Sequence, residues 1–270
     1  MTKEITTVAD EQSLALLRDQ FPADEGFVRQ NFPRLSFYSQ DQTEGKGKAM
    51  KVTDEAGTFY TEKQTEELDP ETGKKIWAKE SIGQEIELIV LYQRKQLKFF
   101  DGEKYTSSTV YDTDDEIVTL FKDKQIVEKG LPKDLKALPQ FQGKSAKGKD
   151  ISKLEDNRLL FVLYKDEVYQ MSLRGTSMYA FMTYARAQSP NTVLTVINSE
   201  AKENGAISWN QMTFKAERQI TQEELDRVLE ETATIKGNIE SEKGYFAARA
   251  DQEGTVTVMS EADKAFLGLK

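Results

Sequence analysis

Aromatic and basic side chains alternate along one stretch of the sequence, between residues 92 and 105. The members of this stretch are Tyr92, Arg94, Lys95, Lys98, Phe99, Phe100 and Tyr105. Single-stranded nucleic acid is held by cations that follow its phosphates and by rings on which its bases stack, at about 1–3 kcal/mol per base. The stretch therefore predicts a surface for a single strand. Aromatic residues on strands also pack inward, so we expect about half of these rings to be buried.

Further cations follow in a lysine-rich segment, residues 122–153, where nine lysines stand against four acidic residues and leave a local charge of +5. Glycine and proline interrupt this segment, which predicts mostly loop. Its members expected to contact phosphates are Lys122, Lys124, Lys144, Lys147 and Lys149. Later residues expected to extend the surface are Arg158, Lys165, Arg174 and Trp209. The alternative interpretation is that these lysines simply belong to solvated loops.

Acidic residues gather elsewhere, and the whole chain carries a net charge of −9. Residues 217–263 contain twelve acids and five bases, a local charge of −7. A chain polarised in this way can present a basic face and stay acidic overall. The acidic C-terminal region is a candidate surface for docking on a replication or recombination protein. The alternative function is an acidic protein-interaction module that docks on a host or replication enzyme.

The composition excludes most catalytic chemistry, because the chain contains neither cysteine nor histidine. Thiol catalysis, cysteine-ligated zinc and histidine-dependent nucleophiles are therefore absent. The densest acidic group is Asp112, Asp114, Asp115 and Glu116. Adjacent acids point in different directions, so we expect no magnesium site there and no cofactor. The sequence predicts a binding protein and not an enzyme.

The N-terminal residues show no apolar segment behind a basic start, and no apolar run approaches the length of a membrane span. We therefore expect a cytoplasmic protein that does not enter a membrane.

The elements that position these residues follow from the hydrophobic pattern. The predicted core lies over residues 84–217 and contains five strands and one helix, over residues 85–100, 159–164, 168–173, 176–188, 192–197 and 206–214. The helix falls between the third and fourth strands, which is the order of an OB-type barrel. A generic antiparallel α+β sheet would give a similar pattern.

The remaining residues are predicted to be additions to this core within a single domain, residues 1–270. An insertion over residues 101–157 carries the lysine-rich segment, and Asp101-Gly102 predicts a hairpin turn at its start. The C-terminal addition, residues 218–270, begins with a capping-box pattern from Thr221 to Glu224. It predicts a helix ending near Gly237 and then a hairpin over residues 245–259.

Several short patterns resemble the single-stranded-DNA-binding proteins of bacteriophages and related mobile elements. The patterns are Leu91-Tyr92-Gln93-Arg94, Phe99-Phe100-Asp101-Gly102, Thr106-Ser107-Ser108, Gly205-Ala206-Ile207-Ser208-Trp209 and Met212-Thr213-Phe214. They cover about half of the chain, residues 85–217. The resemblance implies an OB fold that binds and protects single-stranded DNA during replication or recombination. Many such proteins end in an acidic tail that recruits other enzymes, whereas this sequence ends in Phe266-Leu267-Gly268-Leu269-Lys270.

Overall fold

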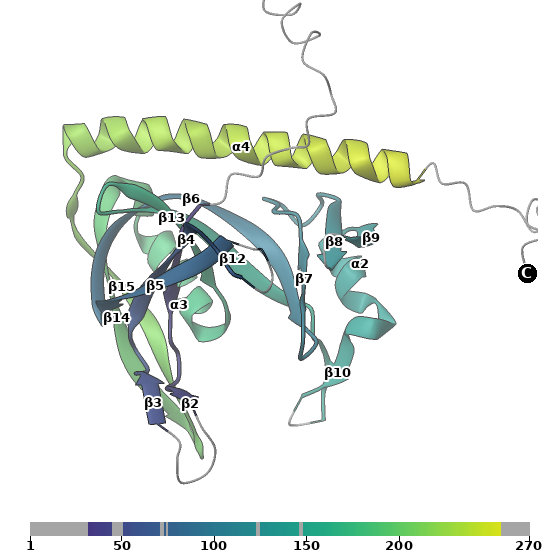
Figure 1. Cartoon of the computed structure of the whole chain (residues 1–270), viewed down its shortest axis with the longest axis horizontal. Coiled ribbons are helices and arrows are strands. Elements are labelled where there is room, and N and C mark those ends of the chain that lie inside the picture. The colour runs from purple at the N-terminus through teal and green to yellow at the C-terminus, as the bar shows by residue number, and fades with distance from the viewer. Residues whose placement is uncertain are drawn as a thin grey trace, which may run out of the picture. The chain divides into compact units, whose positions relative to one another are not determined.

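The computed structural model describes residues 32–44, 51–70, 73, 75–122, 125–145 and 148–254, which form an α+β structure rich in strands (Figure 1). The strands are β1 (Arg34–Phe37), β2 (Gln42–Glu44), β3 (Lys51–Asp54), β4 (Phe59–Leu68), β5 (Lys75–Gly83), β6 (Glu85–Phe100), β7 (Tyr105–Ser108), β8 (Val118–Lys122), β9 (Gln125–Gly130), β10 (Gln142–Lys144), β11 (Asp150–Ser152), β12 (Glu155–Tyr164), β13 (Glu167–Leu173), β14 (Val193–Asn204) and β15 (Ile207–Gln219). The helices are α2 (Pro132–Ala137), α3 (Gly175–Ala187) and α4 (Gln222–Gly254), with single turns η2 (Pro139–Phe141) and η3 (Pro190–Thr192). In this described part of the chain, no helix is both long and apolar enough to span a membrane.

Eleven strands form one sheet in the order β5-β4-β1-β13-β12-β6-β7-β8-β9, with β14 also on β6 and β15 on β14. The long strand β6 is shared between neighbours. Its first residues pair with β14, its middle pairs with β12 and its end pairs with β7. Because β1 pairs with β13 in parallel while the neighbouring pairs are antiparallel, the sheet is mixed.

The predicted closed barrel is not what these strands form. The five predicted core strands are present as β6, β12, β13, β14 and β15, and α3 lies between β13 and β14 as expected. The free side of β13, however, pairs with β1, a strand N-terminal to the predicted core, and not with β15. The described sheet is therefore open.

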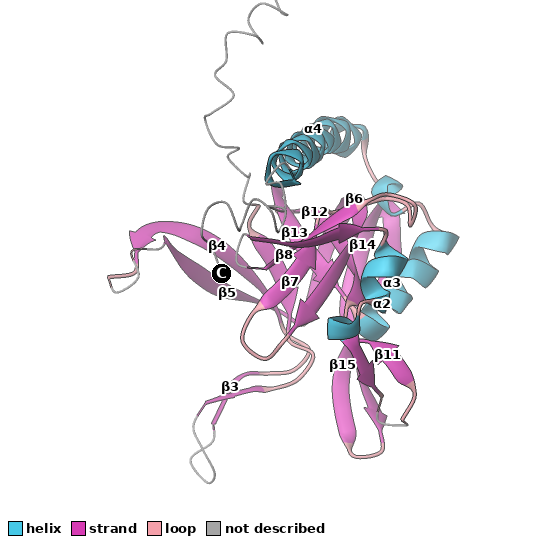
Figure 2. Cartoon of the chain, turned by 90° about the vertical axis from the view of Figure 1, so that its right-hand side faces the viewer, coloured by secondary structure: helices cyan, strands magenta, loops and turns pink. Residues whose placement is uncertain are grey.

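The central strands bury both faces, because α3 and α4 lie on opposite sides of the sheet (Figure 2). On the inner face, Leu88 and Val90 of β6 pack in a cluster with Phe181 of α3. On the outer face, Leu91 of β6 packs with Ile239 of α4. Strand alternation turns consecutive residues of β6 to opposite clusters, and a bulge opposite β12 at Leu91 leaves both Leu91 and Tyr92 with the outer cluster. The near-continuous apolar run in β6 follows from this two-sided burial.

The lysine-rich segment at residues 122–153 is folded, as is the rest of the insertion at residues 101–157, which corrects the prediction that this segment is mostly loop. Strands β7, β8 and β9 extend the sheet beyond β6, and α2 packs beside them. Strand β8 and helix α2 share one apolar cluster with the end of β6, and its buried members include Tyr111, Leu120, Leu135 and Phe141. The glycines and prolines of the segment mark turns between these short elements. The Asp101-Gly102 hairpin is confirmed, since Phe100 pairs with Tyr105 and Gly102 has a φ of 106°.

Helix α4 is longer than predicted and continues to Gly254. Residues 245–249, predicted as a strand, are helical, and residues 255–259 lie outside the described residues. A glycine costs an exposed helix about 1 kcal/mol. The buried side chains of Ile235 and Ile239, on either side of Gly237, pack on the sheet and offset that cost.

The capping box at the start of α4 is confirmed. The Thr221 amide donates to the Glu224 carboxylate at 2.7 Å, and the Glu224 amide donates to Thr221 Oγ1 at 3.3 Å. Arg218 also donates two hydrogen bonds of 2.7 Å to this carboxylate. Together, first Arg218 and then the Thr221 amide lower the pKa of Glu224 to about 2.

We expect α4 to lose part of its stabilisation in acid. A carboxylate with a lowered pKa stabilises the fold above its unfolded pKa, and this contribution disappears as the pH falls from about 4.5 to about 2. Glu224→Gln keeps a capping-box side chain but cannot titrate. Thermal unfolding followed by circular dichroism should therefore show a shallower decline in stability across this pH range for Glu224→Gln. The neighbouring exposed substitution Glu223→Gln is the control, and equal declines for wild type and Glu224→Gln would contradict the prediction.

Candidate nucleic-acid interface

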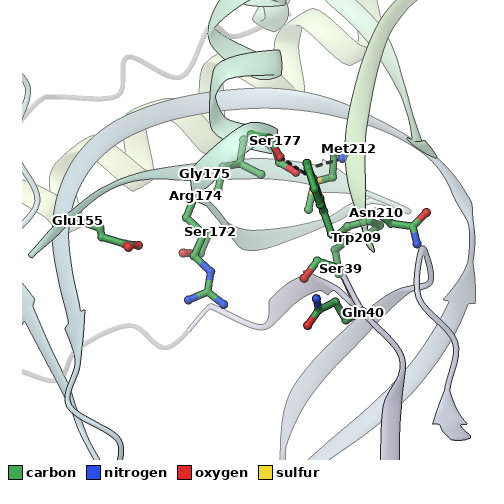
Figure 3. Close-up of a pocket in the computed structure, with 13 residues that line it drawn as sticks. Ser39, Gln40, Glu155, Ser172, Arg174, Gly175, Ser177, Trp209, Asn210 and Met212 are labelled. Atoms are coloured by element: carbon green, nitrogen blue, oxygen red, sulfur yellow. Dashed lines mark hydrogen bonds between the residues drawn. The ribbon is translucent and has the colours of Figure 1, made fainter. Parts of the chain in front are cut away.

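A cavity of about 470 Å³ opens where β13, the start of α3, β15 and the segment after β1 meet (Figure 3). This volume lies within the range of about 300–1,000 Å³ that small-ligand sites occupy. Arg174 and Trp209, both expected to bind nucleic acid, lie in its wall. Figure 3 shows Arg174 and Ser172 directed into the hollow, with Gln40 facing them from the segment after β1.

The turn between β13 and α3 presents Arg174. Arg174 has an extended backbone, with a φ of −139°, and Gly175 then starts the helix with a φ of 56°. A glycine adopts that left-handed conformation without a steric penalty, which allows an abrupt change from strand to helix. Strand alternation places Arg174 on the same face as Ser172, the outer face of the sheet.

Three hydrogen bonds, from two sides, fix the wall around Trp209. Its indole Nε1 donates to Thr176 Oγ1 at 3.2 Å, and the Met212 amide donates to Ser177 Oγ at 3.1 Å, so β15 is joined to the start of α3. On the other side, the Asn210 amide donates to the Ser39 carbonyl at 2.6 Å. The cavity is therefore bounded by elements that hold one another in place.

The Arg174 guanidinium is exposed and forms no ion pair with the described residues. Glu155 also lines the cavity, so one carboxylate moderates the positive charge. An exposed guanidinium with free donors is suited to bidentate binding of a phosphate. The cavity thus combines an available cation with an aromatic ring.

Lys98 extends this surface across two strands. Its Nζ donates to Ser172 Oγ at 3.2 Å, and Ser172 Oγ donates to Asn157 Oδ1 at 2.8 Å. Lys98 is the direct cross-strand neighbour of Glu155. The outer face therefore carries Lys98 and Arg174 on either side of a polar strip.

The end of the β6–β7 hairpin presents two exposed rings. Phe100 and Tyr105 are 49% and 53% exposed, and their ring centroids lie 4.7 Å apart. Lys122 Nζ donates to Asp101 Oδ2 at 2.6 Å beside them and holds the pKa of that carboxyl well below its usual range. Because Phe100 follows Lys98 at a spacing of two residues, both side chains lie on the outer face.

Arg94 is buried, which corrects its predicted contact with a phosphate. Only 4% of its side chain is exposed, and the guanidinium contacts the carboxylates of Asp112 and of Glu240 in α4, the latter at 3.8 Å. It also lies 4.7 Å from the ring of Tyr92, over which Lys236 of α4 lies at 5.3 Å. Helix α4 therefore covers this part of the outer face.

Three more residues predicted to bind nucleic acid lie on the opposite face of the sheet, toward the insertion. They are Lys95, Phe99 and Arg158. Phe99 packs edge-on against Phe141, with centroids 5.5 Å apart. Lys95 pairs with Asp114 at 3.0 Å and is the cross-strand neighbour of Arg158. Alternation along β6 places Lys95 opposite to Lys98. These residues are thus separated from the outer face.

The remaining predicted lysines are dispersed. Lys144 pairs with Asp150 at 2.5 Å on the β10–β11 hairpin, whose strands pair with no strand of the large sheet, and exposed Lys149 lies next to that pair. Lys165 occupies the β12–β13 turn, at the opposite end of that hairpin from Arg174. Lys124 and Lys147 lie outside the described residues.

Three of the four acids at residues 112–116 are paired with cations. Asp112 contacts Arg94, Asp114 pairs with Lys95 and Glu116 pairs with Lys243 of α4 at 2.9 Å. Among the described residues, no three potential metal ligands gather at one place. These carboxylates thus hold the insertion and α4 against β6.

Sequence reasoning missed a further group of rings and cations on β1, β4 and β5. Its members are Arg34, Tyr38, Tyr60, Trp77 and Lys79. A usable signal was present, since Trp77 and Lys79 are spaced by two residues in an exposed strand and therefore share a face.

Comparison with protein-family models, with curated proteins and with solved structures gives no match for this chain.

Proposed function

We propose that this protein binds single-stranded DNA without catalysis, on the outer face between the Trp209 cavity and the β6–β7 hairpin. The observation that carries the proposal is the cavity itself, in which the exposed Arg174 guanidinium and the Trp209 ring line one hollow. A phosphate binds to Arg174 while a neighbouring base stacks on Trp209, which supplies both elements of single-strand binding.

The same face offers further contacts for a longer strand. Lys98 provides a second cation, and Phe100 and Tyr105 provide exposed rings for stacking. Side chains near Trp209 that could hydrogen-bond to a base are Ser39, Gln40 and Asn210. Every base has an aromatic face, so stacking on these rings tolerates any sequence. The proposal is therefore binding with little sequence preference.

The strand pairing supports derivation from an OB fold. Strand β6 divides its length between β12 and β14, and α3 lies between the third and fourth core strands. In this proposal β1 is an addition that separates β13 from β15 and opens the barrel. The resemblance of residues 85–217 to phage and mobile-element proteins extends the proposal to protection of DNA during replication or recombination.

The test is a titration with oligo-dT, followed by tryptophan fluorescence and by anisotropy of a labelled strand. Stacking on Trp209 should quench its emission, and the affinity should be greatest at low salt because phosphate contacts release counterions. Double-stranded DNA of the same length is the control and should bind more weakly. An unchanged anisotropy at low salt would exclude the proposed function.

A further inference from the structure

The outer face of β1, β4 and β5 carries aromatic rings that lie beneath cations. The Arg34 guanidinium lies 4.6 Å from the centroid of the Trp77 ring. Lys79 Nζ lies 4.7 Å from the ring of Tyr60, and that ring stacks on Tyr38 with centroids 4.2 Å apart. None of these side chains belongs to the cavity or to the β6–β7 hairpin. They form a separate group of stacking rings and cations.

Strand pairing places this group on one face. Arg34 pairs with Glu62 and Glu62 pairs with Lys79, while Trp77 pairs with Gln64 one step further along. The intervening residues of β1 and β4, such as Leu35 and Phe59, are buried in the cluster on the inner face. Rings and cations therefore point to the outer side, as Arg174 does.

Strand β1 leads from this group to the cavity. It pairs in parallel with β13, and Phe37 at its end and Ser39 just after it line the cavity from the side of the inner cluster. Neighbouring strands lie about 4.8 Å apart, so β5 is about 14 Å from β13 across the path β5-β4-β1-β13, and the pairings set Trp77 about six residues, or about 20 Å, along the strands from the level of Arg174. A single strand that occupies the cavity must therefore cross about 25 Å to reach Trp77, which a strand of about 12 nucleotides can span.

The cations of this group already form ion pairs within the protein, and a bound DNA strand would have to compete with these pairs for them. Arg34 and Lys79 both lie near Glu62, at 3.9 and 3.6 Å. Both cations are about half-exposed although Glu62 is not, so water screens these two pairs and they contribute little to stability. A base that stacks on Trp77 replaces the guanidinium on the ring, and its phosphate then provides that guanidinium with a new partner.

We propose that β1, β4 and β5 form a second base-stacking subsite, centred on Trp77, for the same single strand that occupies the Trp209 cavity. This inference rests on the proposed function, since the strand must first bind at the cavity. It lengthens the binding path in the direction away from the β6–β7 hairpin.

The chain contains two tryptophans, and one lies in each subsite. The fluorescence of each tryptophan can therefore report binding at its own subsite. Trp77→Phe leaves Trp209 as the reporter, and Trp209→Phe leaves Trp77, while both retain a ring for stacking. Each variant is titrated with oligo-dT of about 12 nucleotides, within the roughly 4–16 nucleotides that one OB fold covers. The strand should quench the emission of both variants.

Removal of the ring provides the matching affinity measurement. Trp77→Ala should weaken binding of the 12-nucleotide strand by about 5- to 150-fold, the loss of one stacked base. The control is Ile76→Ala, an exposed neighbour on the opposite face of the same strand, which should leave the affinity unchanged. Thermal unfolding of each variant establishes that the fold is retained.

The outcomes separate the two proposals. Quenching of Trp209 without any change at Trp77, together with wild-type affinity for Trp77→Ala, overturns the second subsite and leaves the proposed function intact. If neither tryptophan responds and the anisotropy of the labelled strand is constant, both proposals fail. Equal losses for Trp77→Ala and Ile76→Ala indicate damage to β5 and also overturn the second subsite.

Discussion

Arg174→Ala is expected to weaken the binding of oligo-dT by about 10- to 100-fold, the value of charge-assisted hydrogen bonds to one phosphate. The reason is the position of its guanidinium, which is exposed, directed into the Trp209 cavity and without an ion pair among the described residues. Loss of one phosphate contact should also reduce the steepness of the logarithmic salt dependence by about 0.7. Titrations at several salt concentrations measure both effects.

The matched control for this substitution is Arg186→Ala. Arg186 lies in the last turn of α3 and is exposed, whereas Arg174 precedes the first turn of the same helix. Both substitutions remove one positive charge, so a general electrostatic effect would weaken binding equally. The cavity assignment requires a large loss and a changed salt dependence for Arg174→Ala alone. Equal behaviour of the two variants would show that Arg174 contacts no phosphate.

The local elements could be predicted because short-range patterns determine them. The β12–β13 hairpin follows from two apolar runs around Lys165-Asp166, and both turn residues adopt a positive φ. The capping box at Thr221 and the Asp101-Gly102 turn are equally local. Such features depend on neighbours within a few residues, which the sequence displays directly.

The open sheet could not be predicted in the same way. It depends on β1, a strand of four residues whose partners β4 and β13 are distant from each other in the sequence. A strand this short has no distinctive pattern, and its pairing is a tertiary event. The expected barrel failed at that point, although its five strands and helix were in place.

Part of the candidate site could be predicted, namely the residues that lie on correctly identified strands. Arg174, Trp209 and Lys98 come together on one face because β13, β15 and β6 are correctly identified strands whose ends meet there. Arg94 lies four residues before Lys98 in β6, so strand alternation places both side chains on the outer face. Nothing near it in the sequence indicates that α4 will cover it, since Glu240 is far along the chain.

The burial of Arg94 leads to the largest expected effect on stability. Its guanidinium is 4% exposed beneath α4, and Nε has no hydrogen-bond partner among the described residues. Asp112 and Glu240 supply the countercharge. Removal of one partner from a buried ion pair leaves an uncompensated charge, which typically costs about 3–5 kcal/mol. Asp112 is half-exposed, so water moderates the loss, and Asp112→Asn should reduce the free energy of unfolding by about 2–3 kcal/mol.

Replacing Arg94 should cost less stability than replacing Asp112. Comparing the two substitutions tests whether Asp112 stabilises the fold by neutralising the buried guanidinium. Arg94→Met fills a similar volume and leaves Asp112 free to face water, so its effect should stay within about 1 kcal/mol of wild type. The double variant should resemble Arg94→Met, because asparagine at 112 then has no buried charge to neutralise. Urea unfolding of the four proteins forms a double-mutant cycle that measures this coupling. Additive losses from the two substitutions would show that Asp112 stabilises the turn at residues 112–116 and not the buried guanidinium.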